Sequence, residues 1–210
     1  GSSGPFEEKR IAELEKVEND RLLTAVLASW AKSHEKDAAE RCREVLDHLK
    51  LHRNTNLSPN KFVYGVIIDA YARRNQAKRA EAVLRELMSE AGENYSMMPS
   101  AISFNSVVNA WSKSNAADAP HRCMALLKEM SELAQKSGRR DLAPDVVTYT
   151  CVIDAFAKRG DCRQAEEVFR EMWTVGDENV LPNSRTFCAL MHAWTKSASP
   201  DALAKCKQLL

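Results

Sequence analysis

The sequence predicts an all-α protein, an α-solenoid of stacked antiparallel helix pairs, with about five pairs. Three observations predict it. A proline followed by a small polar residue recurs every 38 to 45 residues, at Pro59, Pro99, Pro144 and Pro182. Each of these dipeptides precedes a segment with helical apolar periodicity, and a second amphipathic segment follows each first one.

The first helix of each pair is predicted from its start signal and its apolar stripe. Asn60, Ser100, Asp145 and Asn183 follow the prolines and are natural N-cap residues. A further copy without the proline begins near Asp20. Counted from the cap, the fourth, seventh, eighth and eleventh places are apolar in every copy, as in Tyr64, Ile67, Ile68 and Tyr71. This spacing is typical of a helix that packs on one side.

Second helices are predicted over segments such as "AERCREVLDHL", "AKRAEAVLRELM" and "RQAEEVFREM". Their alignment places Cys42, Cys123 and Cys206 opposite Ala80 and Ala165, which favours buried small thiols over reactive ones. A helix pair of this length cannot bury its own apolar stripe. Stacked pairs form a continuous core, and the sequence therefore predicts a solenoid.

The expected organisation follows from these segments. Residues 1–5 resemble a cloning scar, and residues 6–19 form an N-terminal helical remnant or cap. The repeats are expected at residues 20–60, 61–100, 101–145, 146–183 and 184–210, the last one truncated within its second helix. We therefore expect the chain to be part of a longer protein. We also expect the residues in excess of a regular repeat to follow the second helix, as in "SELAQKSGRRDLAPD".

Composition excludes few functions. Hydrophobic residues make up 44% and charged residues 28% of the chain, and no apolar run approaches the ~18 residues of a membrane span. A net charge of +1 neither requires nor excludes a polyanionic partner. The cysteines contain no CxxC pair, which favours a reduced intracellular protein.

The polar face of the first helices carries the candidate functional residues, at the second, fifth, ninth and thirteenth places. The thirteenth is basic in every copy, which suits either the helix dipole or a phosphate backbone. The second is apolar or arginine, which is either a scattered exposed residue or a surface for stacked bases. The fifth varies, as a reader of base edges would. These residues are Lys32, Arg73, Lys113, Lys158 and Lys196 at the thirteenth place; Arg21, Phe62, Ile102, Val147 and Arg185 at the second; and Thr24, Gly65, Asn105, Thr150 and Cys188 at the fifth.

From about Asp20 to Leu210 the copies resemble pentatricopeptide repeats, and "VVTYTCVIDAFAKRGDCRQAEEVFREMWTVGDENVLPN" carries the resemblance most fully. The units here are longer than the family norm of thirty-five residues, and the tryptophans in "SWAKS", "AWSKS" and "AWTKS" fit long-repeat members of algal or protist type. The resemblance implies single-stranded RNA binding in a mitochondrion or chloroplast, one nucleotide per repeat, in RNA processing, stability or translation. It implies no enzymatic activity, no cofactor and no membrane association.

The resemblance also implies a role for each candidate residue. In the family, the fifth and last residues of a repeat select the base together, the second clamps neighbouring bases, and the thirteenth approaches phosphate. The pairs here are Thr24 with Asn60, Gly65 with Ser100, Asn105 with Asp145, and Thr150 with Asn183, while Cys188 lacks its partner. The implied preference is 5′-A-N-U-A-N-3′. Helix capping alone would also explain the four last residues.

Two alternative functions stay open from the sequence. A tetratricopeptide-like scaffold would hold a peptide in its groove, but it predicts a shorter unit and gives no reason for the basic thirteenth place. A structural component on the rRNA of an organellar ribosome would recognise shape rather than sequence. No catalytic motif is present, and the pairs His48 with His52 and Cys188 with His192 lack a third metal ligand nearby in the sequence.

Overall fold

The computed structural model describes residues 20–33, 35–51, 59–92, 94 and 96–209, and these residues form helices and turns with no strand. The expected N-terminal remnant, residues 6–19, lies outside the described residues. The α-helices are α2 (Asp20–Lys32), α3 (Ala38–Leu51), α4 (Lys61–Arg73), α5 (Ala77–Ala91), α6 (Ala101–Lys113), α7 (Ala119–Ser137), α8 (Val146–Ala157), α9 (Cys162–Val175), α10 (Ser184–Lys196) and α11 (Ala202–Leu209). Two short 3-10 helices, η1 (Arg140–Leu142) and η2 (Glu178–Val180), precede α8 and α10.

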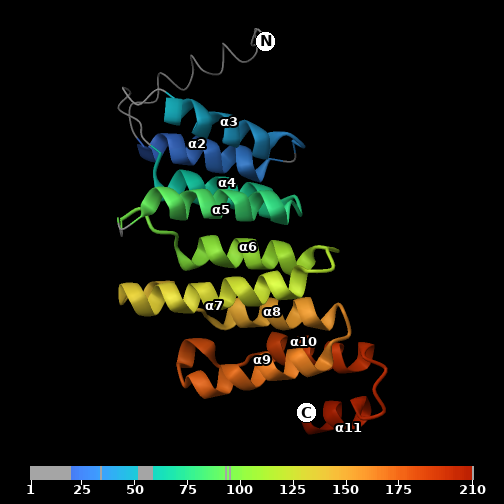
Figure 1. The fold of residues 1–210 in the computed structure, drawn as a ribbon. Helices are drawn as coiled ribbons and strands as arrows, with labels where there is room; N and C mark the ends of the chain where they lie inside the picture. The colour runs from blue at the N-terminus through green and yellow to red at the C-terminus, as the bar shows by residue number, and fades with distance from the viewer. Residues whose placement is uncertain (1–19, 34, 52–58, 93, 95, 210) are drawn as a thin grey trace.

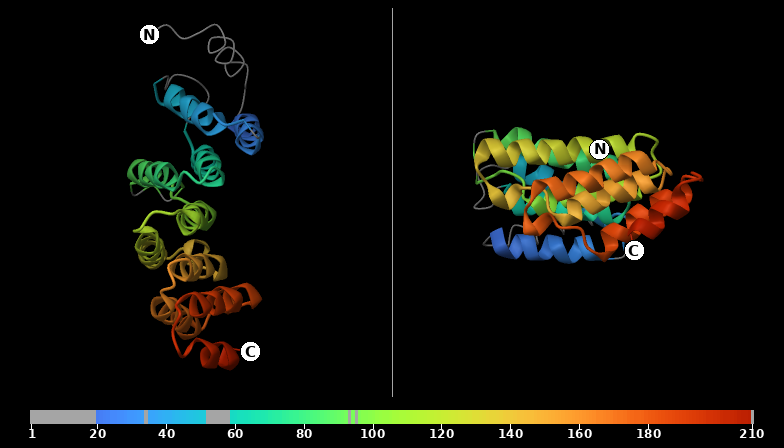
Figure 2. Two further views of the ribbon diagram at one scale, coloured as in Figure 1. Left: turned by 90° about the vertical axis from the view of Figure 1, so that its right-hand side faces the viewer. Right: turned by 90° about the horizontal axis from the view of Figure 1, so that it is seen from below.

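The helices stack as antiparallel pairs along one axis, which confirms the predicted solenoid (Figure 1). The first helices α2, α4, α6, α8 and α10 contact one another in succession, and each of α3, α5, α7 and α9 packs against the first helix before it and the one after it. Seen along the helices, the first helices line the inner side of a gentle curve, and α3, α5, α7 and α9 line the outer side (Figure 2). The polar face of the first helices therefore forms the concave surface.

The apolar stripe forms the core that the sequence predicts. In the central first helices its members are almost fully buried, as for Tyr64, Ile68, Phe104 and Val108. The stripe is less buried in α2 and α10, where Val26 and other members are only half-buried. Each of these end helices has a described first helix on one side only, so less apolar surface is removed from water.

One expectation about the repeat length is wrong. In the third copy, the residues in excess were placed after the second helix, but α7 continues through them to Ser137 and ends at Gly138, whose φ of 66° is left-handed. Leucine, alanine, glutamine and lysine in "SELAQK" are strong helix formers, so the helix ends only where glycine permits the turn. The η1 turn that follows buries Leu142 completely.

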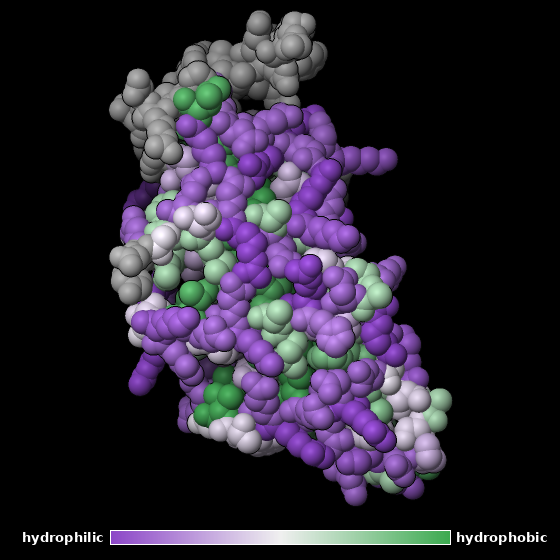
Figure 3. Space-filling view, viewed as in Figure 1, coloured by the Kyte–Doolittle hydropathy of each residue, from purple (hydrophilic) through white to green (hydrophobic). Residues whose placement is uncertain are grey.

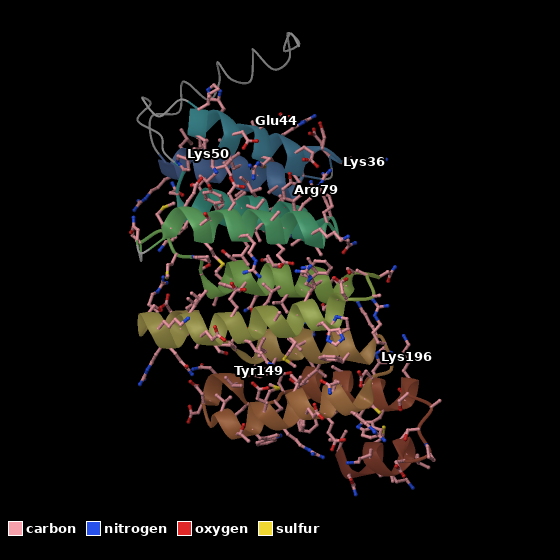
Figure 4. The ribbon with its side chains drawn as sticks, in the orientation of Figure 1. Lys36, Glu44, Lys50, Arg79, Tyr149 and Lys196 are labelled. Carbon is pink, nitrogen blue, oxygen red and sulfur yellow. The ribbon has the colours of Figure 1, made fainter. Side chains whose placement is uncertain are left out.

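The outer surface is mostly hydrophilic, and ion pairs join successive second helices across it (Figure 3). Arg43 of α3 pairs with Glu86 of α5, and Arg85 of α5 pairs with Glu129 of α7. Lys50, labelled in Figure 4, also pairs with Glu86. Exposed pairs of this kind contribute little each, so the apolar core carries most of the stability.

One buried polar contact fixes a first helix against the preceding pair. The indole Nε1 of Trp111 on α6 donates to the carboxylate of Glu81 on α5 at 2.7 Å, and Glu81 is itself only 8% exposed. The same carboxylate pairs with two arginines. Arg85 Nη2 lies 3.3 Å from Glu81 Oε1, and Arg122 Nη1 lies 3.6 Å from it. A buried carboxylate that loses a donor retains its desolvation penalty.

We therefore expect Trp111→Phe to lower the free energy of unfolding by about 1–3 kcal/mol, because Glu81 loses its indole donor while an aromatic ring still occupies the buried position. Urea denaturation followed by circular dichroism measures the change. Trp173→Phe, at an exposed position on α9, is the matched control and should shift stability by less than about 0.5 kcal/mol. Equal effects of the two variants would contradict a stabilising role for the indole–carboxylate contact.

Candidate nucleic-acid interface

A capping side chain precedes each of the first helices α4, α6, α8 and α10. The side chains of Asn60, Ser100, Asp145 and Asn183 all accept hydrogen bonds from backbone N–H groups two or three residues later, which confirms their prediction as N-caps. At α8 and α10 the cap is reciprocal, because Thr148 and Thr186 bond back to the backbone of the cap residue. The last residue of four repeats is thus fixed by the helix that it starts.

A groove of about 620 Å³ on the concave face brings together the four candidate residues of the third copy with some of those of the fourth and fifth copies. The lining includes Ile102, Asn105, Lys113, Asp145, Val147, Thr150, Asn183 and Arg185, together with Ser106, Asn109, Val146 and Cys151. The predicted second, fifth, thirteenth and last places are therefore contiguous in space. Of the other candidates, Thr24 and Gly65 are half-buried on α2 and α4, and Cys188 is exposed on α10.

The predicted pair Asn105 and Asp145 is in direct contact between two successive first helices. Asn105 Nδ2, from α6, lies 3.2 Å from both carboxylate oxygens of Asp145, the cap of α8. Thr148 Oγ1 donates to Asn105 Oδ1 at 2.6 Å. A carboxylate has about four lone-pair positions, so Asp145 can cap α8 and hold Asn105 and still accept a further donor.

The fourth pair has a different geometry. Thr150 was expected on the water-exposed face, but it is only 3% exposed, because α10 packs beside it and its Oγ1 lies 2.8 Å from Thr186 Oγ1. Thr186 Oγ1 in turn lies 3.2 Å from Asn183 Oδ1. Thr150 and Asn183 are thus linked through the hydroxyl of a third residue, Thr186, rather than directly, and both still line the groove.

The second places are exposed in all five copies. Phe62, Ile102 and Val147 have exposed fractions of 63%, 77% and 51%, and Arg21 and Arg185 are exposed as well. Ile102 and Val147 come from successive first helices and line the same groove, with Asn105 between them in the chain. A planar group that enters the groove would meet apolar side chains from two neighbouring repeats.

The basic thirteenth places divide into two groups. Lys158 Nζ donates to the carbonyl oxygen of Ser112 at 2.6 Å, and Lys196 Nζ donates to that of Lys158 at 2.7 Å. Both lysines thereby cap the end of the preceding first helix (Lys196 is labelled in Figure 4). Arg73 pairs with Asp69 one turn earlier at 2.6 Å. Lys32 and Lys113 are exposed, and Lys113 lines the groove.

The fourteenth place also acts at these junctions, and the sequence analysis missed it. Arg74 donates to the carbonyl oxygens of Ala31, Ser33 and Glu35, and Arg159 reaches that of Ala116. Arg74 therefore spans to the end of the preceding first helix, α2, and to the turn after it, and Arg159 spans to the turn after α6. Paired basic letters in "ARR" and "AKR" are the only signal for this role in the sequence.

Helix α8 carries one partly buried acid, Asp154, and one protected thiol, Cys151, of which only Cys151 lines the groove. Burial raises the pKa of Asp154, although the charges of Arg185, Lys158 and His192 oppose the shift. Burial also raises the pKa of Cys151 to about 11, so this thiol is protonated at neutral pH and is a poor nucleophile. Among the described residues, no three His, Cys, Asp or Glu side chains are grouped to hold a metal ion. His52 of the pair noted above lies outside them.

Comparison with known proteins supports the family directly. The model "PPR repeat family" matches residues 144–196, and the model "PPR repeat" matches residues 62–90. The chain therefore contains pentatricopeptide repeats. The matched segments contain α4 with α5, and α8 with α9 and α10, so the repeats with the fewest departures from the pattern are the ones recognised.

Relatives and solved structures agree with this assignment. A chloroplastic pentatricopeptide repeat-containing protein of Arabidopsis thaliana is 29% identical over 63% of this chain and 15% of its own length. A mitochondrial one is 23% identical over 87% of this chain and 46% of its own length. The crystal structure of PPR10 from maize superposes with a TM-score of 0.66 at 20% identity, over 96% of this chain and 26% of that one. This chain thus spans less than half of each of these proteins.

Two further features bear on the setting of this pentatricopeptide repeat chain. A small ribosomal subunit protein of Arabidopsis thaliana is 22% identical over 66% of this chain and 38% of its own length. Within the described part of the chain, every helix is too short or too polar to cross a lipid bilayer.

Substitutions in the two groups of thirteenth-place cations should differ in their effect on stability. Lys158→Ala should lower the free energy of unfolding by about 0.5–1.5 kcal/mol, because the carbonyl of Ser112 loses its donor. Lys113→Ala removes an exposed side chain with no ion pair among the described residues and should change stability by less than about 0.5 kcal/mol. Thermal unfolding of the two variants measures this difference. A larger loss of stability for Lys113→Ala than for Lys158→Ala would contradict the division of the thirteenth-place cations into two groups.

Proposed function

We propose that the chain binds single-stranded RNA along the concave face of the first helices, with about one base per repeat. The groove that joins Asn105, Asp145 and Lys113 carries the proposal. The groove is lined by a hydrogen-bonded Asn–Asp pair, exposed apolar side chains and an exposed lysine, which would suit a base edge, a base plane and a phosphate. Bound RNA in a crystal structure of PPR10, an 18-nt psaJ RNA element, supports the same ligand for this family.

The proposed reading follows the pairs of fifth and last residues. Thr24 with Asn60 and Thr150 with Asn183 would each select adenine, and Asn105 with Asp145 would select uracil. Gly65 with Ser100 and the unpartnered Cys188 leave the second and fifth bases unread, which gives 5′-A-N-U-A-N-3′. Phe62, Ile102, Val147, Arg21 and Arg185 would hold the base planes.

We infer a scaffold rather than an enzyme, which acts on organellar RNA in processing, stability or translation. Relatives named chloroplastic and mitochondrial support the organellar setting. The similarity to a small ribosomal subunit protein favours one second candidate, a structural component that contacts rRNA by shape. The two candidates differ in one respect, because only the first predicts an enriched A-N-U-A register when RNAs are selected from a random pool. The family match favours both over a peptide-binding tetratricopeptide-like scaffold.

Recoding one repeat tests base reading. Asn105→Thr together with Asp145→Asn gives the third copy the residue types of the fourth, where Thr150, Thr186 and Asn183 already form a compatible set. The change should move the third nucleotide from U to A, and a correct match should be worth about 1–3 kcal/mol by analogy with other base-edge contacts. Binding of A-N-U-A and A-N-A-A RNAs to both proteins measures it.

The matched control for the recoding is a second Asn–Asp pair outside the groove lining. Asn179 Nδ2 lies 3.0 Å from Asp177 Oδ1 in the turn at η2, and Asn179→Thr with Asp177→Asn should leave the ratio of the two affinities unchanged. If the recoded protein is folded and keeps the wild-type ratio, Asn105 and Asp145 are surface and cap residues only.

Salt dependence tests the phosphate contact separately. Lys113→Ala should weaken binding to all RNAs by a similar factor and reduce the slope of log K against log salt concentration by about 0.7 to 1. Lys136→Ala, an exposed lysine near the end of α7 on the outer layer, should leave the slope as it is. A change in base preference on Lys113→Ala would show that this lysine contacts bases instead of phosphate.

A further inference from the structure

The third place of the first helices carries a buried hydroxyl in three successive copies. Ser103, Thr148 and Thr186 occupy it, with exposed fractions of 4%, 0% and 0%. These side chains point between two first helices and are covered by protein, so RNA in the groove does not touch them. The second copy has Val63 at the same place, also fully buried and without a hydroxyl.

At the junction of α6 and α8 the hydroxyl of Thr148 closes a ring of hydrogen bonds. It accepts from the backbone N–H of Asp145 at 3.2 Å, which leaves its single proton to donate. Asn105 Oδ1 at 2.6 Å is a closer acceptor than Asp145 Oδ1 at 3.0 Å. With Oδ1 engaged by Thr148 and Nδ2 directed at the carboxylate, the amide plane of Asn105 is fixed.

The same arrangement recurs at the neighbouring junctions. Thr186 Oγ1 lies between Thr150 Oγ1 at 2.8 Å and Asn183 Oδ1 at 3.2 Å. Ser103 Oγ lies 3.2 Å from Ser100 Oγ, and a Cβ placed on Gly65 would lie 3.7 Å from it. In each case the hydroxyl stands between the fifth residue of one repeat and the last residue of the same repeat.

Helix capping does not account for this contact. Helix α4 is capped by Asn60, which accepts from the backbone N–H of Phe62 and of Val63, although Val63 offers no hydroxyl. The cap needs only the backbone N–H of the third residue. The bond from Thr148 to Asn105 joins two repeats and adds nothing to the cap of α8.

We propose that the third residue of a repeat is a buried positioning residue that sets the base preference of the preceding repeat. The inference rests on the proposed RNA binding and deepens it. With its oxygen occupied, Asn105 presents an N–H to the groove, and Asp145 beside it presents a carboxylate lone pair. A donor next to an acceptor fits the carbonyl and ring N–H of uracil or guanine, and it opposes the reversed pattern of adenine and cytosine.

The test compares Thr148→Val and Thr186→Val, which remove the hydroxyls and retain the side-chain shape, with the hydroxyl-retaining Thr148→Ser. Binding is measured to four RNAs that carry U or A at the third nucleotide and A or U at the fourth. Thr148→Val should reduce the U-over-A ratio at the third nucleotide by about 2- to 10-fold, the range of one hydrogen bond. It should leave the base preference at the fourth nucleotide unchanged. Thr148→Ser should keep the wild-type U-over-A ratio at the third nucleotide.

Thr186→Val provides the crossed control, because it should change the preference at the fourth nucleotide and leave the third as it is. A purely structural role would weaken all four RNAs by one factor, and that outcome would overturn the proposal. Wild-type protein that binds RNA with no base preference, or binds none, would overturn base reading itself. The two outcomes can be told apart, because the wild-type protein still shows a base preference in the first and shows none in the second.

A measurement without RNA checks the geometry independently. In the wild-type protein, the Asn105 amide proton that is directed at the Asp145 carboxylate should exchange slowly with solvent, since Thr148 holds the amide oxygen and so fixes the amide plane. Nuclear magnetic resonance should show faster exchange in Thr148→Val and slow exchange in Thr148→Ser. Equal exchange rates in the three proteins would also overturn the proposal.

Discussion

The arrangement of the concave face depends on one requirement, that the first backbone N–H groups of each first helix have an acceptor. In α4, α6, α8 and α10 the acceptor is the side chain of the residue just before the helix. Because the first helices stack side by side, the cap of one lies against the fifth residue of the helix before it, as Asp145 lies against Asn105. Capping and base reading are therefore not competing explanations of the same residues. A carboxylate that caps a helix still has acceptor capacity, and an amide whose oxygen caps a helix still has its two N–H donors.

At the C-terminal ends of the first helices, carbonyl oxygens lack a partner within the helix, and basic side chains donate hydrogen bonds to them. Arg74, Lys158 and Lys196 each reach back to the end of the preceding first helix. Such a bond ties neighbouring repeats together and places positive charge along one edge of the concave face. The charge of a lysine whose Nζ is held by a carbonyl still acts on a phosphate nearby, but the side chain is less free to follow it. Lys113, which lines the groove without such a bond, is for this reason the better candidate for the proposed phosphate contact.

Sequence periodicity was sufficient for the fold and for the position of most candidate residues. The apolar stripe, the small tenth place and the proline-cap dipeptides each have a local physical cause, so they are legible one repeat at a time. Features that depend on contacts between repeats could not be predicted from the sequence in this way. The burial of Thr150 needs Thr186 from the next helix, and the roles of Arg74 and Arg159 need carbonyl groups of the preceding one. The extension of α7 has another cause, because the high helix propensity of "SELAQK" continues the helix past the length of a regular repeat.

These contacts define a functional unit that differs from the repeat read along the chain. Asn105 belongs to one first helix, while Asp145 and Thr148 begin the next. The unit that would read one base therefore runs from the fifth place of a first helix, through its second helix, to the third place of the following first helix. A segment transferred from Ala101 to Asp145 would carry both readers but would leave Thr148 behind. The recipient would then supply its own third residue, and a valine there, as at Val63, would leave the amide of the transferred asparagine without its donor. Base preference is on this view a property of the junction between two stacked helices, which is why it depends on the packing that holds them in register.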